Sequence, residues 1–295
     1  MRDFADLVYA EWTKLTTVRS WVWWLVGGVV GTVALTALWA SYWQIWVEVP
    51  QGGGVPTLAV DELIDMAMSS VLQMVVFTLA AVLVVAVLYA TSEYQYRTLR
   101  TTFTASPRRV QALLAKAVVV AATGFCVTLV AITAASAAVF LVKRAEPEGI
   151  CYGDDHGWVG CSPPSFSFSP VPVETTVAVL STAVTVALLA VIATCLAMAW
   201  QRTARPVVVL VATVVVPYLF LEPAGPGLGI YGRVTPLAGF HPQQASHGGW
   251  TWFSSLPADL GVLVLWTAGA LVATAVVLRR RDAVDAPSLS SAAAS

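Results

Sequence analysis

Charged residues are scarce in this chain, and their scarcity excludes an ordinary soluble domain. Only 11% of the 295 residues are charged and 58% are hydrophobic, against roughly 25% and 45–50% in an average soluble domain. The net charge of -1 gives no electrostatic footprint for nucleic acid. Uncharged runs that are long enough to cross the ~30 Å hydrocarbon core account for the imbalance. The composition therefore predicts an integral membrane protein.

Two kinds of charged site are also missing. The only lysines, Lys14, Lys116 and Lys143, precede Leu, Ala and Arg, so none completes the Gly-Lys-Ser/Thr end of a Walker A loop. The uncharged runs contain none of the Asp, Glu, His or Lys residues that mark an ion path in gradient-driven carriers. We expect a protein that is not an enzyme and binds no cofactor, and whose energy comes from another chain.

Six uncharged windows predict six transmembrane helices in a transmembrane domain of residues 20–281. The windows are 21–43, 67–90, 117–142, 175–199, 206–221 and 260–278. The fifth is the shortest and would rise only about 24 Å as a helix. It contains Pro217 and precedes the Gly/Pro-rich run 223–229. A helix that stops inside the membrane is compatible with both features, so we expect a re-entrant outer segment before the sixth span.

Lys and Arg residues concentrate in alternate connecting segments. All 16 except Lys143, Arg144 and Arg233 lie in the N-terminal segment, the loops after the second and fourth spans, or the C-terminal segment. Because positive residues are retained on the cytoplasmic side, both termini are predicted to be cytoplasmic. Residues 282–295 are predicted to form a flexible cytoplasmic tail.

Residues 1–19 have the pattern of an interfacial amphipathic helix. One helical stripe carries the apolar residues Phe4, Leu7, Val8, Trp12, Leu15 and Val18. Such a helix would lie along the inner leaflet of the bilayer with Trp12 at the level of the headgroups. Glu11 and Lys14 are spaced i,i+3 and can pair on its flank, for a few tenths of a kcal/mol. The alternative is a helix that only anchors the first span.

The loop after the second span, 91–116, is longer than a simple reversal of direction requires. Its sequence is polar and compatible with helix, and Ser106-Pro107 interrupts it. Because proline disfavours helix at the residue before it and suits a helix start, we expect two short helices joined by a turn. We interpret this loop as a cytoplasmic coupling loop onto which another protein docks. The alternative is a solvated loop that only enforces topology.

Within this loop, the spacing of the charges predicts a docking ridge. The steps from Glu93 to Arg97 and Arg100 are four and three residues, so the three side chains can share one helical face. Arginine presents a planar fork of donors that can grip a carboxylate or backbone carbonyls of a partner. We expect Glu93 and Arg100 to transmit force, and Arg97, Arg108 and Arg109 to fix the docking orientation.

Two cysteines, Cys151 and Cys161, lie in the predicted outer loop between the third and fourth spans. Disulfides persist in extracytoplasmic compartments, and the Gly-containing stretch between the two cysteines can bring them together. We expect a disulfide. The alternative is a metal site that combines both cysteines with His156 and with Asp154 or Asp155, although this spacing matches no standard zinc pattern.

Two motifs resemble a known family. The sequences AEWTKLTTVRSWVWWL at 10–25, TSEYQYRTLRTT at 91–102 and SPRRVQALLAK at 106–116 resemble actinobacterial permease subunits of ATP-binding-cassette transporters, in the type-2 export permease superfamily. The first motif is matched by Glu11, Lys14 and Arg19. The second motif is matched by Glu93, Tyr94, Thr98, Arg100, Pro107, Arg109 and Lys116. Many relatives have Gly at the position of Arg97, which is a departure.

The resemblance implies a fold and a mechanism. The fold would be an all-α integral membrane protein of the bacterial plasma membrane, with the interfacial helix, six spans, coupling loop and re-entrant segment described above. A separate ATPase subunit would bind ATP and magnesium and drive the permease through residues 91–116. A second permease copy, or a related permease, would complete the transport path. Export is expected by family analogy.

The spans themselves restrict the cargo. Without intramembrane charge to pair with an ion, a hydrophobic or amphipathic compound such as a drug, an antibiotic or a lipid-like molecule is favoured. Two alternatives from other classes are also compatible with the sequence. The chain could be a non-transporting membrane anchor or sensor that recruits a cytoplasmic partner, or an uncoupled channel or carrier.

Overall fold

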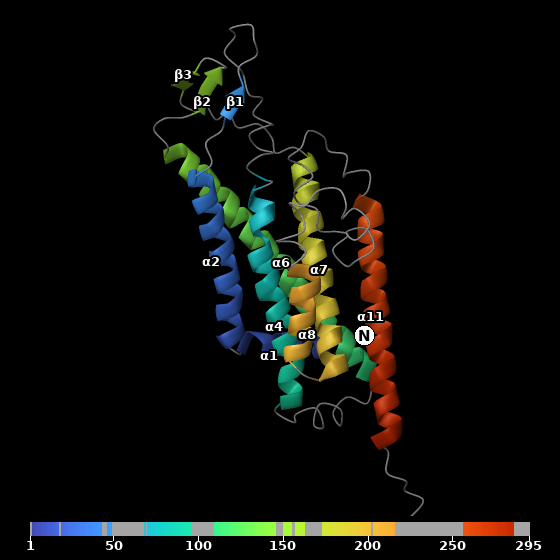
Figure 1. The fold of residues 1–295 in the computed structure, drawn as a ribbon. Coiled ribbons are helices and arrows are strands. Elements are labelled where there is room, and N and C mark those ends of the chain that lie inside the picture. The colour runs from blue at the N-terminus through green and yellow to red at the C-terminus, as the bar shows by residue number, and fades with distance from the viewer. Residues whose placement is uncertain are drawn as a thin grey trace, which may run out of the picture.

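The chain is nearly all helical in the part that the structure, a computed structural model, describes (Figure 1). The described residues are 2–17, 19–42, 46–48, 68, 70–95, 109–145, 150–154, 157–162, 173–201, 203–215 and 256–285. Their helices are α1 (Arg2–Thr17), α2 (Arg19–Tyr42), α4 (Val76–Gln95), α6 (Arg109–Ala145), α7 (Val173–Trp200), α8 (Ala204–Leu210), the π-helix η1 (Val211–Val215) and α11 (Leu256–Asp285).

Five helical stretches are long and apolar enough to cross a membrane. They are Ser20–Ser41, Ser70–Ser92, Val110–Val142, Thr175–Trp200 and Leu260–Leu278. These stretches coincide with the first four predicted spans and the last one, so the chain is a multi-pass membrane protein. The fifth predicted span begins as the shorter apolar helix Ala204–Val214. Pro217, the run 223–229 and therefore the predicted re-entrant segment lie outside the described residues.

The helices α4 and α7 form the centre of the bundle. Both are largely buried, whereas α2, α6 and α11 present most of their surface outward. Figure 1 shows α2 at one edge and α11, packed beside α7, at the other. The core contains apolar side chains such as Leu79, Val87 and Leu189, which are fully buried. A bundle that is apolar both inside and outside is what a lipid environment requires.

A close helix contact joins α2 to α4. A Cβ built on Gly28 would lie 2.5 Å from the Cβ of Ala81, so the two backbones approach as closely as glycine permits. Beside this contact the hydroxyls of Thr32 and Thr78 are hydrogen-bonded at 2.8 Å. Small residues and interhelical hydrogen bonds are the usual means by which membrane helices associate.

A small sheet departs from the all-α prediction. The strands are β1 (Trp46–Glu48), β2 (Ile150–Asp154) and β3 (Gly157–Ser162), in the order β1-β2-β3. β1 pairs with β2 in parallel, and β2 with β3 in antiparallel orientation. The sheet lies beyond the end of the bundle opposite to α1 (Figure 1). Backbone pairing lets these loop segments satisfy their N–H and C=O groups where no helix continues.

Two predicted boundaries were wrong. α11 continues to Asp285, so residues 282–285 of the predicted flexible tail are helical. No proline lies between the sixth predicted span and Pro287. A proline disfavours helix at its own position and at the residue before it, so nothing prevents the helix from continuing to Asp285. The second predicted short helix of the coupling loop is the beginning of α6, because no glycine or proline interrupts the sequence between Arg109 and the third span.

Candidate functional site

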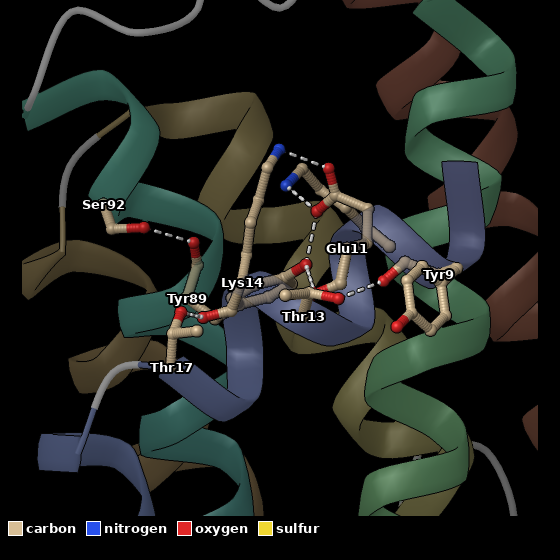
Figure 2. A network of polar contacts seen from close by, with 8 residues as sticks. Tyr9, Glu11, Thr13, Lys14, Thr17, Tyr89 and Ser92 are labelled. Atoms are coloured by element: carbon tan, nitrogen blue, oxygen red, sulfur yellow. Dashed lines mark hydrogen bonds and ion pairs between the residues drawn. The ribbon is translucent and has the colours of Figure 1, made fainter. Parts of the chain in front are cut away.

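The main polar cluster among the described residues is built around Glu11 of α1. Its side chain is only 1% exposed, and each carboxylate oxygen has a cationic partner. The Nζ atom of Lys14 lies 2.6 Å from Oε1, and the Nζ atom of Lys116 lies 2.6 Å from Oε2. The hydroxyl of Tyr89 donates a hydrogen bond to Oε2. Dashed lines in Figure 2 mark contacts of this network, and we call these four residues the Glu11 cluster.

Three helices bring the cluster together. α1 supplies Glu11 and Lys14, α4 supplies Tyr89 near its C-terminal end, and α6 supplies Lys116 near its N-terminal end. In Figure 1, α1 runs across the end of the bundle at which α4 ends and α6 begins. The buried face of α1 carries Glu11 and Leu15, which are four residues apart and therefore lie on the same side of the helix.

The ring of Tyr89 is held on two sides. The ring of Trp21 meets it edge-on, with 5.2 Å between centroids and an interplanar angle of 87°. The ammonium of Lys116 lies 4.6 Å from its centroid, which is within the range of a cation–π interaction. The tyrosine therefore contacts the beginning of α2, α1 and α6 at once. Such a buried aromatic residue with a satisfied hydroxyl orients the groups around it.

Opposing effects act on the pKa of Glu11. Burial alone would raise it, because desolvation penalises the carboxylate. The positive charge of Lys116 and the hydrogen bonds from Lys116, Lys14 and Tyr89 outweigh burial, and they hold the pKa below its usual 4.5. Glu11 is therefore ionised at neutral pH. Because desolvation offsets much of the attraction in a buried ion pair, its firmest consequence is a defined geometry among the three helices.

The predicted flank position of Glu11 needs a correction. Trp12, a residue of the predicted apolar stripe, is 45% exposed, and Tyr9 is 72% exposed. Glu11, which was placed on the flank, lies at the centre of the buried face. The spacing of Glu11 from Val8 and Leu15, at three and four residues, is the signal that could have placed it there. The headgroup position of Trp12 stays a prediction, and its exposure is compatible with it.

The structure places only part of the predicted coupling residues. Glu93 lies in the last turn of α4, and Arg109 is the first residue of α6. Arg19 is likewise the first residue of α2. The remaining members lie outside the described residues: Arg97, Thr98, Arg100, Pro107 and Arg108. The docking ridge therefore stays a prediction.

Sequence reasoning found one pair of the Glu11 cluster and missed its other members. The predicted pair of Glu11 and Lys14 is confirmed. Lys116 appeared only as a matching residue of the second motif, and Tyr89 was not singled out. The isolated positive charge at the start of an otherwise uncharged span was a signal for Lys116, because such a charge requires a partner. Nothing in the sequence marks Tyr89 apart from its position near the end of a span.

The two cysteines of the predicted outer loop face each other in the backbone register of the sheet. Cys151 of β2 is directly opposite Cys161 of β3. Such antiparallel partners have Cα atoms about 4.5–5.5 Å apart, which lies within the range of a disulfide. The disulfide stays a prediction. Within the part of the chain that the structure describes, no three His, Cys, Asp or Glu side chains gather as metal ligands; Asp155 and His156 lie outside it.

Comparison with known proteins adds no family. No protein-family model matches the sequence, and a search of curated proteins found no match. Fold and site together define a multi-pass membrane protein with a buried ionic cluster at one end of its helix bundle.

Proposed function

We propose that this chain is the transmembrane permease subunit of an ATP-driven exporter, and that a separate ATP-binding-cassette ATPase drives it. The observation that carries the proposal is the position of its charges. Lys116 is the only charged residue within the five candidate spans, and Glu11 compensates its charge at one end of the bundle. These spans therefore offer no chain of ionisable groups for an ion gradient, and the energy must enter from outside them.

The helices α4 and α6 provide a route for that energy. α4 continues beyond its membrane-spanning part to Gln95, and α6 runs unbroken from Arg109 to Ala145. Both helices therefore extend from the segment 96–108 into the packed core. We call the segment 96–108 the coupling segment and the adjoining helix ends its stems. A force applied to the coupling segment reaches the core through continuous helices, as ATPase coupling requires.

The interior of the bundle favours an apolar cargo. Several buried threonines bond to their own helix: the hydroxyls of Thr36, Thr128 and Thr194 donate to backbone carbonyls four residues earlier, at 2.7–2.9 Å. Each of these hydroxyls uses its only hydrogen within its own helix, so it has no donor left for a polar ligand and can only accept. The cargo is therefore a hydrophobic or amphipathic compound, of the drug, antibiotic or lipid-like kind. A second permease, identical or related, supplies the other wall of its path.

The surface of α1 fits a position at the membrane–water boundary. Tyr9 and Trp12 are exposed on one side of this helix, whereas Lys14 is half-exposed on another. Aromatic residues are enriched at the headgroup level, and basic residues on the cytoplasmic side. In this arrangement α1 lies on the inner leaflet of the bacterial plasma membrane with both termini cytoplasmic.

Affinity purification of the chain from its native membrane in mild detergent tests the proposal. We expect an ATPase with a Walker A loop to co-purify and to hydrolyse ATP faster when a hydrophobic compound is added. The chain alone should hydrolyse no ATP. ATP hydrolysis by the chain alone that a substitution in it abolishes would contradict the proposal. A cytoplasmic partner without ATPase activity would instead favour the membrane-anchor function.

A further inference from the structure

The two stems of the coupling segment contact Glu11 at nearly the same distance from that segment. Tyr89 lies six residues before the end of α4 at Gln95, and Lys116 lies seven residues after the start of α6 at Arg109. At 1.5 Å per residue both side chains are about 9–11 Å from the coupling segment. Both also contact the same carboxylate oxygen, Oε2 of Glu11. One atom of a third helix therefore bridges the two stems.

We propose that Tyr89 and Lys116 are positioning residues that tie both stems of the coupling segment to α1 through the carboxylate of Glu11, a role that rests on the proposed function. When the ATPase displaces the coupling segment, α1 moves together with the ends of α4 and α6. The interfacial helix is then a working part of the coupling mechanism rather than an anchor of the first span.

The burial of the bridge explains why it can act in this way. Lys116 and Glu11 are 2% and 1% exposed, so water does not compete with their contact. Separating them would leave the ammonium of Lys116 without its counter-charge in an apolar environment, and it would leave Glu11 with only the half-exposed Lys14, so intermediate positions are strongly disfavoured. The ring of Tyr89 adds a second contact to the same ammonium. The three helix ends therefore have one strongly preferred arrangement.

Lys14 provides a matched control for this role. It pairs with the other oxygen of Glu11 at the same distance, 2.6 Å, but it belongs to the same helix and is 44% exposed. Its removal deletes one ion pair of Glu11 without releasing a contact of that carboxylate to α4 or α6. Loss of the bridge and loss of a local ion pair can therefore be compared in two lysine variants of similar size.

The test compares the wild type, Lys116→Met and Lys14→Met in lipid nanodiscs and proteoliposomes. The first readout is hydrogen–deuterium exchange of the α1 amides, which needs no ATPase. The second is the coupling ratio, the ATP hydrolysed per molecule of a fluorescent amphipathic compound transported with the co-purified ATPase. In Lys116→Met we expect at least tenfold faster exchange of α1 and a several-fold higher coupling ratio. In Lys14→Met both values should stay within twofold of the wild type.

The two readouts separate the possible failures. Wild-type exchange of α1 in Lys116→Met would overturn the tie itself. Fast exchange with an unchanged coupling ratio would overturn its role in coupling, as would equal effects of the two lysine variants. Absence of any ATPase in the wild-type preparation would refute the proposed function and, with it, this role. If Lys116→Met fails to insert, Tyr89→Phe replaces it, and wild-type values of both readouts there would overturn the proposal.

Discussion

The contact between α2 and α4 makes a sharp prediction for Gly28→Ala. The new Cβ would lie 2.5 Å from the Cβ of Ala81 and 3.4 Å from both the carbonyl oxygen of Phe77 and the Cα of Thr78. Carbon atoms in favourable contact are about 3.5–4.0 Å apart, so the two helices must separate by roughly 1 Å. We expect this separation to destabilise the bundle, although alanine favours a helix more than glycine does.

The magnitude follows from three contributions. Overpacking of a well-packed contact costs about 1–3 kcal/mol. The separation weakens two interhelical hydrogen bonds, between the hydroxyls of Thr32 and Thr78 and from Thr78 to the carbonyl of Gly28, which in membranes contribute about 0.6 kcal/mol each. The higher helix propensity of alanine offsets about 1 kcal/mol. The net loss in free energy of unfolding is about 1–3 kcal/mol.

The neighbouring glycine supplies the control. A Cβ on Gly27 meets nothing within 4 Å, so Gly27→Ala should retain or increase the stability of the wild type. Unfolding in mixed detergent micelles, followed by tryptophan fluorescence, measures both variants. The double variant Gly28→Ala/Ala81→Gly removes the clash and should recover most of the loss. Equal stabilities of the Gly27 and Gly28 variants would refute the close contact of α2 and α4.

Four further predictions test the rest of the account. Lys116→Met should lower the free energy of unfolding by about 3 kcal/mol, because it removes the buried cationic partner of Glu11 and leaves that carboxylate with only the half-exposed Lys14. The double variant Glu11→Leu/Lys116→Met should unfold close to the wild type, and equal losses in both variants would contradict the buried pair. Because the folded-state pKa of Glu11 lies below 4.5, the contribution of Glu11 to stability is present at neutral pH and is lost as the pH falls from about 4.5 through the folded-state value. Unfolding midpoints measured from about pH 6 to 3 should fall less steeply in Glu11→Gln than in the wild type. An equal slope in both proteins would contradict this contribution of Glu11. Mass spectrometry of a non-reduced digest should recover Cys151 linked to Cys161, and free thiols under oxidising conditions would exclude the bridge. Arg100→Lys should insert normally but bind the ATPase more weakly in co-purification, since its charge is kept while its fork of donors is lost; wild-type binding would mean that this arginine only enforces topology.

The spans could be predicted because one physical requirement determines them. A segment that crosses the hydrocarbon core must exclude charge over its whole length, and five of the six uncharged windows coincide with long apolar helices. The amphipathic helix at the N-terminus was predictable for a similar reason, since its periodicity is local. Helix boundaries do not follow from the absence of charge alone: α11 extends past the uncharged window 260–278 to Asp285, and no proline or glycine lies between Arg279 and Asp285 to end it.

The Glu11 cluster could be predicted only in part because its main contacts join residues far apart in sequence. The pair of Glu11 and Lys14 follows from a spacing within one helix. The bonds of Glu11 to Tyr89 and to Lys116 depend on how α1 crosses two other helices, and no periodicity encodes that crossing. The register of Cys151 and Cys161 has the same character, because the sequence limits their separation but does not determine which residues pair across the strands.

ATP-dependent uptake into inside-out proteoliposomes tests the central claim most directly. Vesicles that contain the chain and the ATPase purified with it, with the ATP-binding face outward, are supplied with a fluorescent amphipathic compound. The account predicts that the compound accumulates only when chain, ATPase and ATP are all present. Accumulation at the same rate without ATP, or sustained ATP hydrolysis by the assembled complex with no accumulation of any hydrophobic compound tested, would contradict it.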